Sequence, residues 1–217
     1  PAAVVESEPY RPEIDPANFA HRIDNPYLPL IPGTQLSYEG ISDGERETEE
    51  FVVTDRTKTI LGVETTVVRD SVYVAGELVE DTSDWFAQDR HGNVWYFGEA
   101  SHDIQNGKVV STHGSWEAGV DGAVPGIVML GDPRAGDTYR QEFYEGEAED
   151  IATVVTLTDT VKVPFGSFED VLKTEDTNPL EPKVLENKYY APGVGVVFEE
   201  LVHGEEGFLE LVDVTTA

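Results

Sequence analysis

Short runs of β-prone residues alternate with turn signals over most of the chain. Runs such as Phe51-Val52-Val53 and Val72-Tyr73-Val74 consist of β-branched and aromatic residues, and pairs that contain Gly, Asn or Asp separate one run from the next. Asn106-Gly107 is the strongest turn signal, because both central residues of a tight hairpin turn need positive φ. No long stretch repeats its apolar residues with the 3.6-residue period of a helix. The pattern predicts an all-β domain from Thr34 to Val214 in which helix is confined to short turns.

The regular spacing of these turns predicts antiparallel pairing between strands that follow one another in the chain. Such hairpin connections are short, whereas parallel strands need long crossovers that usually contain a helix. We therefore expect an all-β single domain, built as an antiparallel meander that forms a curved sheet, a sandwich or a barrel. The segment Gly114–Asp137 is rich in glycine and contains two prolines, and it is predicted as a long structured loop.

Seven prolines among residues 1–33 predict an N-terminal arm with little regular structure. Asp15 can cap one short helix that begins at Pro16 and continues from Ala17 to Ile23. We expect a Pro-rich arm over residues 1–33 and a β domain over residues 34–217. The arm is expected to pack on its own domain or on a partner chain, and in the second case it would support a homo-oligomer.

The chain is strongly acidic, with 43 Asp and Glu residues against 14 Lys and Arg residues and a net charge of -29. This charge repels nucleic-acid phosphates and anionic membrane surfaces, and it attracts cations. Solubility or salt tolerance explains such a composition, and cation binding is the alternative. No stretch approaches the roughly 20 apolar residues of a membrane-spanning helix. The absence of cysteine excludes disulfides and thiolate metal sites.

Four segments together resemble a family of uncharacterised exported bacterial proteins that are acidic and β-rich. They are Asn25–Gly33, Asp84–Glu99, Gly114–Met129 and Tyr189–Glu200. The resemblance spans most of the chain from residue 16 onward. It implies one β-rich unit that is secreted or held in the cell envelope of a bacterium. It implies no activity and no site residues.

Two histidines flank the Asn106-Gly107 turn. If these two residues form the turn, Gln105 pairs with Lys108, Ile104 with Val109 and His102 with Ser111. His102 and His113 then lie on one face as diagonal neighbours, roughly 7–8 Å apart at the backbone.

Two imidazoles and a carboxylate can bind zinc or copper. Glu117 is the candidate third ligand, with His91 as a second candidate, and a metal site at His102, His113 and Glu117 is one hypothesis for function. The alternative is a pair of ordinary histidines on a half-buried hairpin.

Three clusters of carboxylates are candidates for calcium, which needs several oxygens converging at about 2.3–2.6 Å. They are Glu45, Glu47, Glu49 and Glu50; Glu142, Glu145, Glu147, Glu149 and Asp150; and Glu199, Glu200, Glu205 and Glu206. Glu45, Glu47 and Glu49 have the parity of one strand face, which we expect to be exposed. We favour a solvated edge that also prevents edge-to-edge aggregation.

Aromatic residues crowd around the predicted turn at His91-Gly92-Asn93. Trp85, Trp95 and Tyr96 can form the wall of a pocket for an apolar ligand or a stacking platform for a sugar. The alternative is core packing, because large aromatic side chains are usually buried. Both faces of the second run are apolar, so the hairpin is expected to be buried on both sides or shifted by a bulge at Gly98.

The sequence lacks the motifs of several enzyme classes. It contains no Gly-x-Ser-x-Gly elbow, phosphate-binding loop or dinucleotide fingerprint. We favour a non-enzymatic exported protein that binds a cation or a small apolar ligand, with calcium, zinc or copper as candidate metals. The alternatives are an extracellular hydrolase, and a structural or assembly protein that uses its N-terminal arm.

Overall fold

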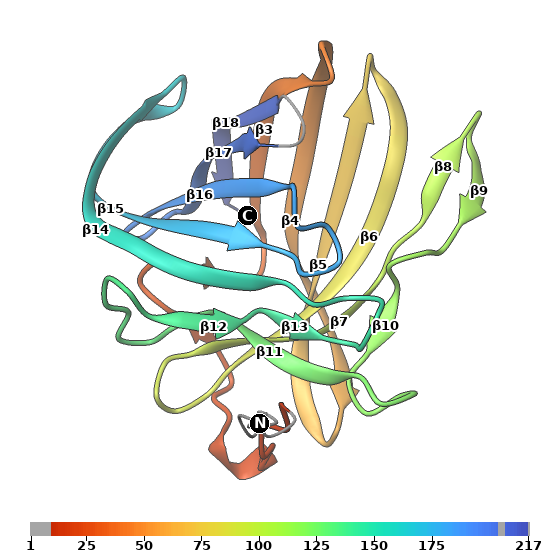
Figure 1. Ribbon diagram of the computed structural model, residues 1–217, viewed down its shortest axis with the longest axis vertical. Helices are drawn as coiled ribbons and strands as arrows, with labels where there is room; N and C mark the ends of the chain where they lie inside the picture. Colours follow the sequence, from red (N-terminus) through yellow and green to blue (C-terminus); the bar gives the residue numbers. More distant parts are fainter. Residues whose placement is uncertain (1–9, 204–206, 217) are drawn as a thin grey trace, which may run out of the picture.

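A single antiparallel sheet of 16 strands dominates the computed structural model, which describes residues 10–203 and 207–216 (Figure 1). The strands of its main path are β3 (Thr34–Ser42), β4 (Glu45–Ile60), β5 (Val63–Val74), β6 (Glu77–Gln88), β7 (Val94–Ala100), β11 (Val124–Met129), β12 (Thr138–Arg140), β13 (Glu142–Phe143), β14 (Ile151–Val163), β15 (Gly166–Thr177), β16 (Leu185–Ala191), β17 (Gly195–His203) and β18 (Gly207–Thr216). Shorter elements are the 3-10 helix η1 (Pro16–Asn18), β1 (Ile23–Asp24), β2 (Pro29–Leu30), β8 (Asp103–Gln105), β9 (Lys108–Ser111) and β10 (Trp116–Glu117).

The sheet curls until its two ends meet. The strand order is β12-β14-β15-β16-β17-β18-β3-β4-β5-β6-β7-β11-β13, so most neighbours in the sheet are also neighbours in the chain. The terminal strands β12 and β13 are separated by Gln141 alone, and this one segment pairs with β14 through β12 and with β11 through β13. The predicted all-β antiparallel domain is confirmed, and it takes the form of a nearly closed barrel.

The hairpin turns follow the local sequence. Asp43-Gly44, Ala75-Gly76 and Asn106-Gly107 all have positive φ at both positions, with values of 49° and 81°, 52° and 83°, and 52° and 69°. This is the geometry of the tight turns whose twist matches that of the flanking strands. Leu61-Gly62 adopts the same geometry, with φ of 51° and 82°, although leucine is not a usual turn residue.

The prediction of a long loop over Gly114–Asp137 was wrong, because this segment contains β10 and β11. On β11, Gly126 pairs with Tyr96 of β7. A Cβ atom on Gly126 would lie 2.3 Å from the carbonyl group of Gln141, so glycine lets the closing segment cross at close range. Here glycine serves close packing between strands, and it was mistaken for a loop signal.

The helix predicted in the arm is shorter than expected. It begins at Pro16, and the Asp15 carboxylate caps it by accepting a hydrogen bond from the Ala17 backbone at 3.0 Å. It ends at Asn18 rather than Ile23, because the chain then makes sheet-like contacts. The Ala20 amide donates to the Gln88 carbonyl at 2.8 Å, and Ile23 pairs with Leu30.

The arm passes across one end of the barrel, at the bottom of Figure 1. Phe19 packs edge-on against Phe97 with the ring centroids 5.6 Å apart. Asn25 is 1% exposed, and its side-chain amide donates to the carbonyls of Gly92 at 2.8 Å and Leu130 at 3.0 Å. The described residues of the arm therefore pack on their own domain.

Buried apolar side chains form two clusters. One joins the arm to strands β4 to β7 through Leu30, Val53 and Phe97 and extends to β11 and β14 to β16. The other lies under β3 and β14 to β18 and includes Val171 and Leu211. Among the described residues, no helix has the length and hydropathy needed to cross a membrane.

Candidate functional site

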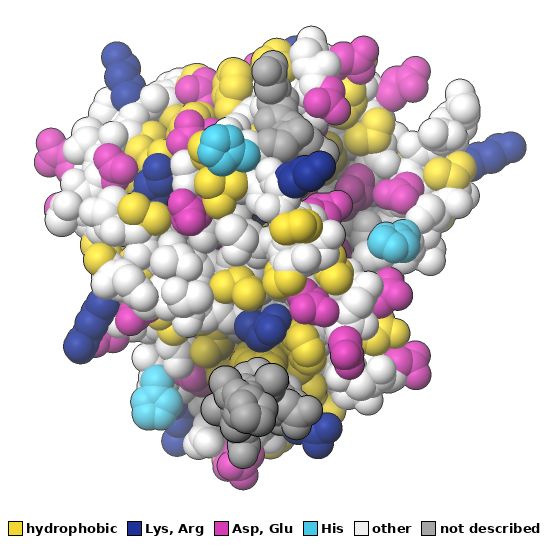
Figure 2. Space-filling model, viewed as in Figure 1, with side chains coloured by type: hydrophobic (Ala, Val, Ile, Leu, Met, Phe, Trp, Pro, Cys, Tyr) yellow, Lys and Arg dark blue, Asp and Glu magenta, His cyan; other side chains and the backbone are white. Residues whose placement is uncertain are grey.

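The charged surface does not single out a site on the face shown in Figure 2. Asp and Glu side chains are spread over that face and alternate with Lys and Arg side chains. This distribution is typical of a solubilising surface. The acids that call for a functional explanation lie inside the barrel.

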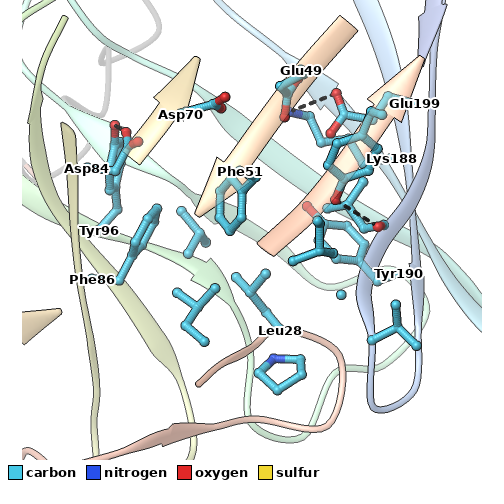
Figure 3. A pocket seen from close by; sticks show the side chains of 18 of the residues that line it. Leu28, Glu49, Phe51, Asp70, Asp84, Phe86, Tyr96, Lys188, Tyr190 and Glu199 are labelled. Atoms are coloured by element: carbon cyan, nitrogen blue, oxygen red, sulfur yellow. Dashed lines mark hydrogen bonds and ion pairs between the residues drawn. The ribbon is translucent and has the colours of Figure 1, made fainter. Parts of the chain in front are cut away.

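A cavity of about 300 Å³ lies inside the barrel above the arm (Figure 3). Its apolar wall is formed by residues that include Leu28, Leu30, Phe51, Phe86 and Val128. Its polar wall is formed by Glu49, Asp70, Asp84, Lys188 and Glu199, with the hydroxyl-bearing rings of Tyr38, Tyr96 and Tyr190. In the close-up the labelled acids and Lys188 occupy the upper part of the cavity, and Leu28, Phe86 and Tyr190 lie in the lower part.

The alternation of side chains along each strand produces this division. Residues two apart in a strand share a face, so Glu49 and Phe51 of β4 both point inward. The same spacing places Asp84 beside Phe86 on β6, while β16 contributes Lys188 and Tyr190. Neighbouring strands thus supply a charged group and an aromatic ring to one interior.

The register places three of the acids in a row across adjacent strands. Asp70 of β5 pairs with Phe51 on β4 and with Thr82 on β6. Glu49 and Asp84 are each two residues away from these partners, so both are diagonal neighbours of Asp70, roughly 7–8 Å away at the backbone.

Hydrogen bonds and ion pairs satisfy part of this polar wall. Tyr96 donates its hydroxyl to Asp84 Oδ1 at 2.7 Å. Lys188 Nζ lies 3.3 Å from Glu186 Oε2 and 3.7 Å from Glu199 Oε2. Asp70 Oδ1 is buried without a hydrogen-bond partner among the described residues. A buried acceptor without a donor is uncommon and destabilises the folded state.

Burial raises the pKa of every carboxyl group in the cavity wall. It raises the pKa of Asp84 to about 7, against the Tyr96 hydrogen bond, which lowers it. It raises the pKa of Glu199 to about 8, although the charge of Lys188 acts in the opposite direction. Burial also raises the pKa values of Glu49 and Asp70 well above their ordinary range, with a further contribution from neighbouring carboxylates. Asp84 and Glu199 therefore titrate near neutral pH.

The row of acids continues beyond the cavity. Glu99 of β7 pairs with Asp84, and burial raises its pKa to about 9. Glu142 of β13 accepts a hydrogen bond from Trp116 Nε1 at 3.0 Å, and burial raises its pKa to about 8. The interior thus carries many more acids than a filled barrel core would contain.

The carboxylate clusters predicted from the sequence are divided between the two faces of the sheet. The expectation that the Glu45–Glu49 face is exposed was wrong for Glu49, which faces the cavity. In the second cluster, Glu142 is buried while Glu145 is exposed. In the third, Glu199 lines the cavity, and Glu205 and Glu206 lie outside the described residues.

The histidine hairpin has the predicted register next to its turn but not beyond it. The pairs Gln105–Lys108 and Ile104–Val109 are confirmed. A bulge then pairs Asp103 with Ser111, so the predicted pairing of His102 with Ser111 was wrong. An extra residue on one strand reverses the parity of every pair beyond it, which a two-residue turn signal cannot reveal.

The three proposed metal ligands have separate partners. His102 Nδ1 lies 3.2 Å from the Asp81 carbonyl oxygen, and His113 Nε2 lies 3.9 Å from Glu147. Glu117 pairs with Lys58 Nζ at 2.8 Å. Within residues 10–203 and 207–216, no three His, Cys, Asp or Glu side chains are arranged to hold a metal ion. Zinc, copper or calcium binding at these residues stays a prediction without geometric support.

The three aromatic residues predicted to bind a ligand are also divided. Tyr96 lines the cavity. Trp85 lies under Lys58 Nζ, which is 3.2 Å from its ring centroid, and Trp95 Nε1 donates to Asp89 at 2.9 Å. The bulge expected at Gly98 is present, since the β6–β7 register shifts there and Gly98 has φ of 121°.

Sequence analysis missed Asp70 and Asp84 of the cavity wall, and it named Glu49 and Glu199 only as members of acidic clusters. The pattern that could have revealed them is a charged residue two positions from an aromatic one within a strand, as in Glu49 and Phe51 or Asp84 and Phe86. Such a pair places a charge and an apolar ring on the same face, and burial of the ring then implies burial of the charge.

Comparison with known proteins gives a fold but no activity. No protein-family model and no curated protein matches the chain. A solved structure from Bacteroides fragilis, described as a "putative exported protein with YMCC-like fold", matches with a TM-score of 0.51 and 16% identity over 88% of this chain and 99% of that chain. A "putative lipoprotein" from Parabacteroides distasonis matches with a TM-score of 0.48 and 12% identity over 87% of this chain and 98% of that one. The chain therefore shares its barrel-like fold with the Bacteroides protein.

Proposed function

We propose that this protein is a non-enzymatic binding protein that holds a small, partly apolar molecule inside its barrel. The observation that carries the proposal is the cavity of about 300 Å³ between the arm and the polar wall. Pockets for small molecules measure about 300–1,000 Å³ and combine apolar walls with a few polar groups that orient the ligand. The size of this cavity favours a ligand at the small end of that range.

An incompletely filled interior distinguishes a carrier from a purely structural barrel. Side chains fill the interior of small barrels unless the barrel holds a ligand. Here Phe51, Phe86 and Leu28 belong to one apolar cluster and still border the open space of the cavity. This arrangement supports binding rather than a scaffold role.

We also propose that the protein works outside the cytoplasm, secreted or held in the cell envelope. Four segments resemble exported bacterial proteins, and the matching structure from Bacteroides fragilis is described as a "putative exported protein". A ligand available outside the cytoplasm fits this location.

The two alternative functions have less support. An assembly role for the arm would need it to reach another chain, and its described residues pack on their own barrel through Asn25 and Phe19. A hydrolase with two carboxyl groups usually holds one ionised and the other protonated. In this cavity burial shifts the pKa values of Asp84 and Glu199 in the same direction, to about 7 and about 8.

Titration calorimetry with simple six-carbon probes tests the proposal. The probes are 1-hexanol, n-hexylammonium and hexanoate, and at least one is expected to bind saturably at one site per chain. Val128→Trp fills the cavity from β11 and should abolish that binding. Val155→Trp makes the same change at a position that is 45% exposed on β14 and should leave binding intact. Binding of none of the three probes, or binding that survives in a folded Val128→Trp protein, would overturn the proposal.

A further inference from the structure

We infer that the ligand carries a small organic cation of the primary ammonium class, held by Glu49, Asp70 and Asp84. This inference rests on the proposed function and specifies the chemical class of its ligand. It depends on the balance of charge in the cavity wall, on one buried oxygen without a partner, and on the apolar surface beside it.

The acidic groups that line the cavity outnumber the basic ones, so the wall has excess negative charge whenever these acids are ionised. Its wall contains the carboxyl groups of Glu49, Asp70, Asp84 and Glu199 but the single ammonium group of Lys188. Buried charges in proteins are normally paired with opposite charges. The wall is therefore complementary to a further positive charge.

Lys188 is already engaged on one side of the cavity. Its Nζ atom lies 3.3 Å from Glu186 Oε2 on β16 and 3.7 Å from Glu199 Oε2 on β17. In the described part of the chain, neither Lys188 nor any other Lys or Arg forms an ion pair with Glu49, Asp70 or Asp84. These acids of β4, β5 and β6 are the part of the wall that is available to a ligand.

Asp70 marks where the cation would bind. It lies between Glu49 and Asp84 in the row across the three strands, and it lines the cavity. Its Oδ1 atom is buried and has no donor among the described residues, whereas Asp84 Oδ1 receives the Tyr96 hydroxyl. Among the described residues, the Asp70 carboxylate lines the cavity without a protein donor, so its oxygen that faces the cavity can accept from a ligand N–H group.

The geometry favours an ammonium group over a metal ion. No three acids in the described ranges are arranged to hold a metal, so their oxygens do not converge on one point. An ammonium group does not need three converging oxygens, because it can donate to Asp70 alone or with one neighbouring carboxylate while the remaining acid attracts its charge from farther away. Phe51 and Phe86 lie two residues from Glu49 and Asp84 on the same strands, where a hydrocarbon chain attached to the cation would pack.

The same three probes test this inference with isosteric variants. At pH 8, n-hexylammonium should bind at least about tenfold more tightly than 1-hexanol, the difference that a charged hydrogen bond supplies. Hexanoate should bind more weakly than either. Asp70→Asn and Asp84→Asn should each weaken the binding of n-hexylammonium by about tenfold or more. Each should change the affinity for 1-hexanol by less than about twofold. Glu50→Gln removes an exposed carboxylate next to Glu49 and should change neither affinity.

The outcomes separate this inference from the proposed function. Equal affinity for 1-hexanol and n-hexylammonium, both lost in Val128→Trp, would overturn the cationic ligand and leave the binding function standing. Tighter binding of hexanoate than of n-hexylammonium would likewise overturn the cationic ligand and leave the binding function standing. Binding of n-hexylammonium that is unchanged in Asp70→Asn and Asp84→Asn would show that the cation binds elsewhere on the acidic surface. Absence of binding by all three probes would overturn both. Thermal unfolding of each variant establishes that it is folded.

Discussion

Replacing Asp84 by asparagine is expected to stabilise the empty protein at pH 8 and to have little effect at pH 4. The side chain is 8% exposed and accepts the Tyr96 hydroxyl at 2.7 Å. An amide oxygen also accepts that hydrogen bond, although less strongly than an ionised carboxylate does. The substitution therefore removes the charge and keeps the shape and the hydrogen bond.

The magnitude follows from the pKa of Asp84. Burial raises it from 3.8 to about 7. The folded protein thus holds the proton more tightly than the unfolded chain, so stability falls as the pH rises from about 4 to about 7 and stays lower above that range. About three pH units at about 1.4 kcal/mol each correspond to about 4 kcal/mol at pH 8. This value is an upper bound, because Glu80 and other neighbouring acids respond when the charge is removed.

Urea unfolding at pH 4 and pH 8, followed by tryptophan fluorescence, measures the effect. Asp81→Asn on the same strand is the control, for which we expect the opposite change in stability at pH 8. Partial burial raises the pKa of Asp81, but the Arg69 hydrogen bond and charge together lower it below its ordinary value, so its ionised form stabilises the fold. Asp81→Asn should therefore destabilise at pH 8. If Asp84→Asn were less stable than the wild type at pH 8, or changed stability equally at both pH values, the account of a buried charge would be refuted.

Three further substitutions test other parts of the structure by urea unfolding. Asn25→Ala leaves the partly buried carbonyls of Gly92 and Leu130 without their donor and should destabilise by about 2–4 kcal/mol. A loss below about 0.5 kcal/mol, the size of an ordinary surface change, would show that the arm is not held there. Gly98→Ala should destabilise by about 2–4 kcal/mol, because its Cβ would lie 2.2 Å from the Trp116 carbonyl oxygen. Gly44→Ala, with φ of 81° and open space around it, should lose only about 1 kcal/mol; equal losses at the two glycines would contradict the close approach. Lys188→Met removes the cation beside Glu199 and should lower the free energy of unfolding by about 2 kcal/mol. This loss should grow from pH 5 to pH 9 as Glu199 ionises. A loss that does not depend on pH would argue against that ion pair.

Features that depend on a few neighbouring residues could be predicted from the sequence. The turns at Ala75-Gly76 and Asn106-Gly107 form because positive φ at both positions closes a tight hairpin wherever it occurs. The bulge at Gly98 was one of the two alternatives inferred from a strand whose faces are both apolar, the other being burial on both sides. Asp15 and Pro16 correctly marked the start of the 3-10 helix. In each case the deciding interactions lie within one hairpin or one turn.

Only the tertiary structure decided which face of each strand is inside. On β4, Glu49 and Phe51 share one face, and Glu50 and Val52 share the other, so both faces combine an acid with an apolar residue. Alternation assigns residues to faces but cannot choose between two faces of similar polarity. Closure of the sheet made that choice, because the segment around Gln141 pairs with β11 and with β14 at once. That long-range closure turned the sheet face that carries Glu49, Asp70 and Asp84 inward, toward the cavity.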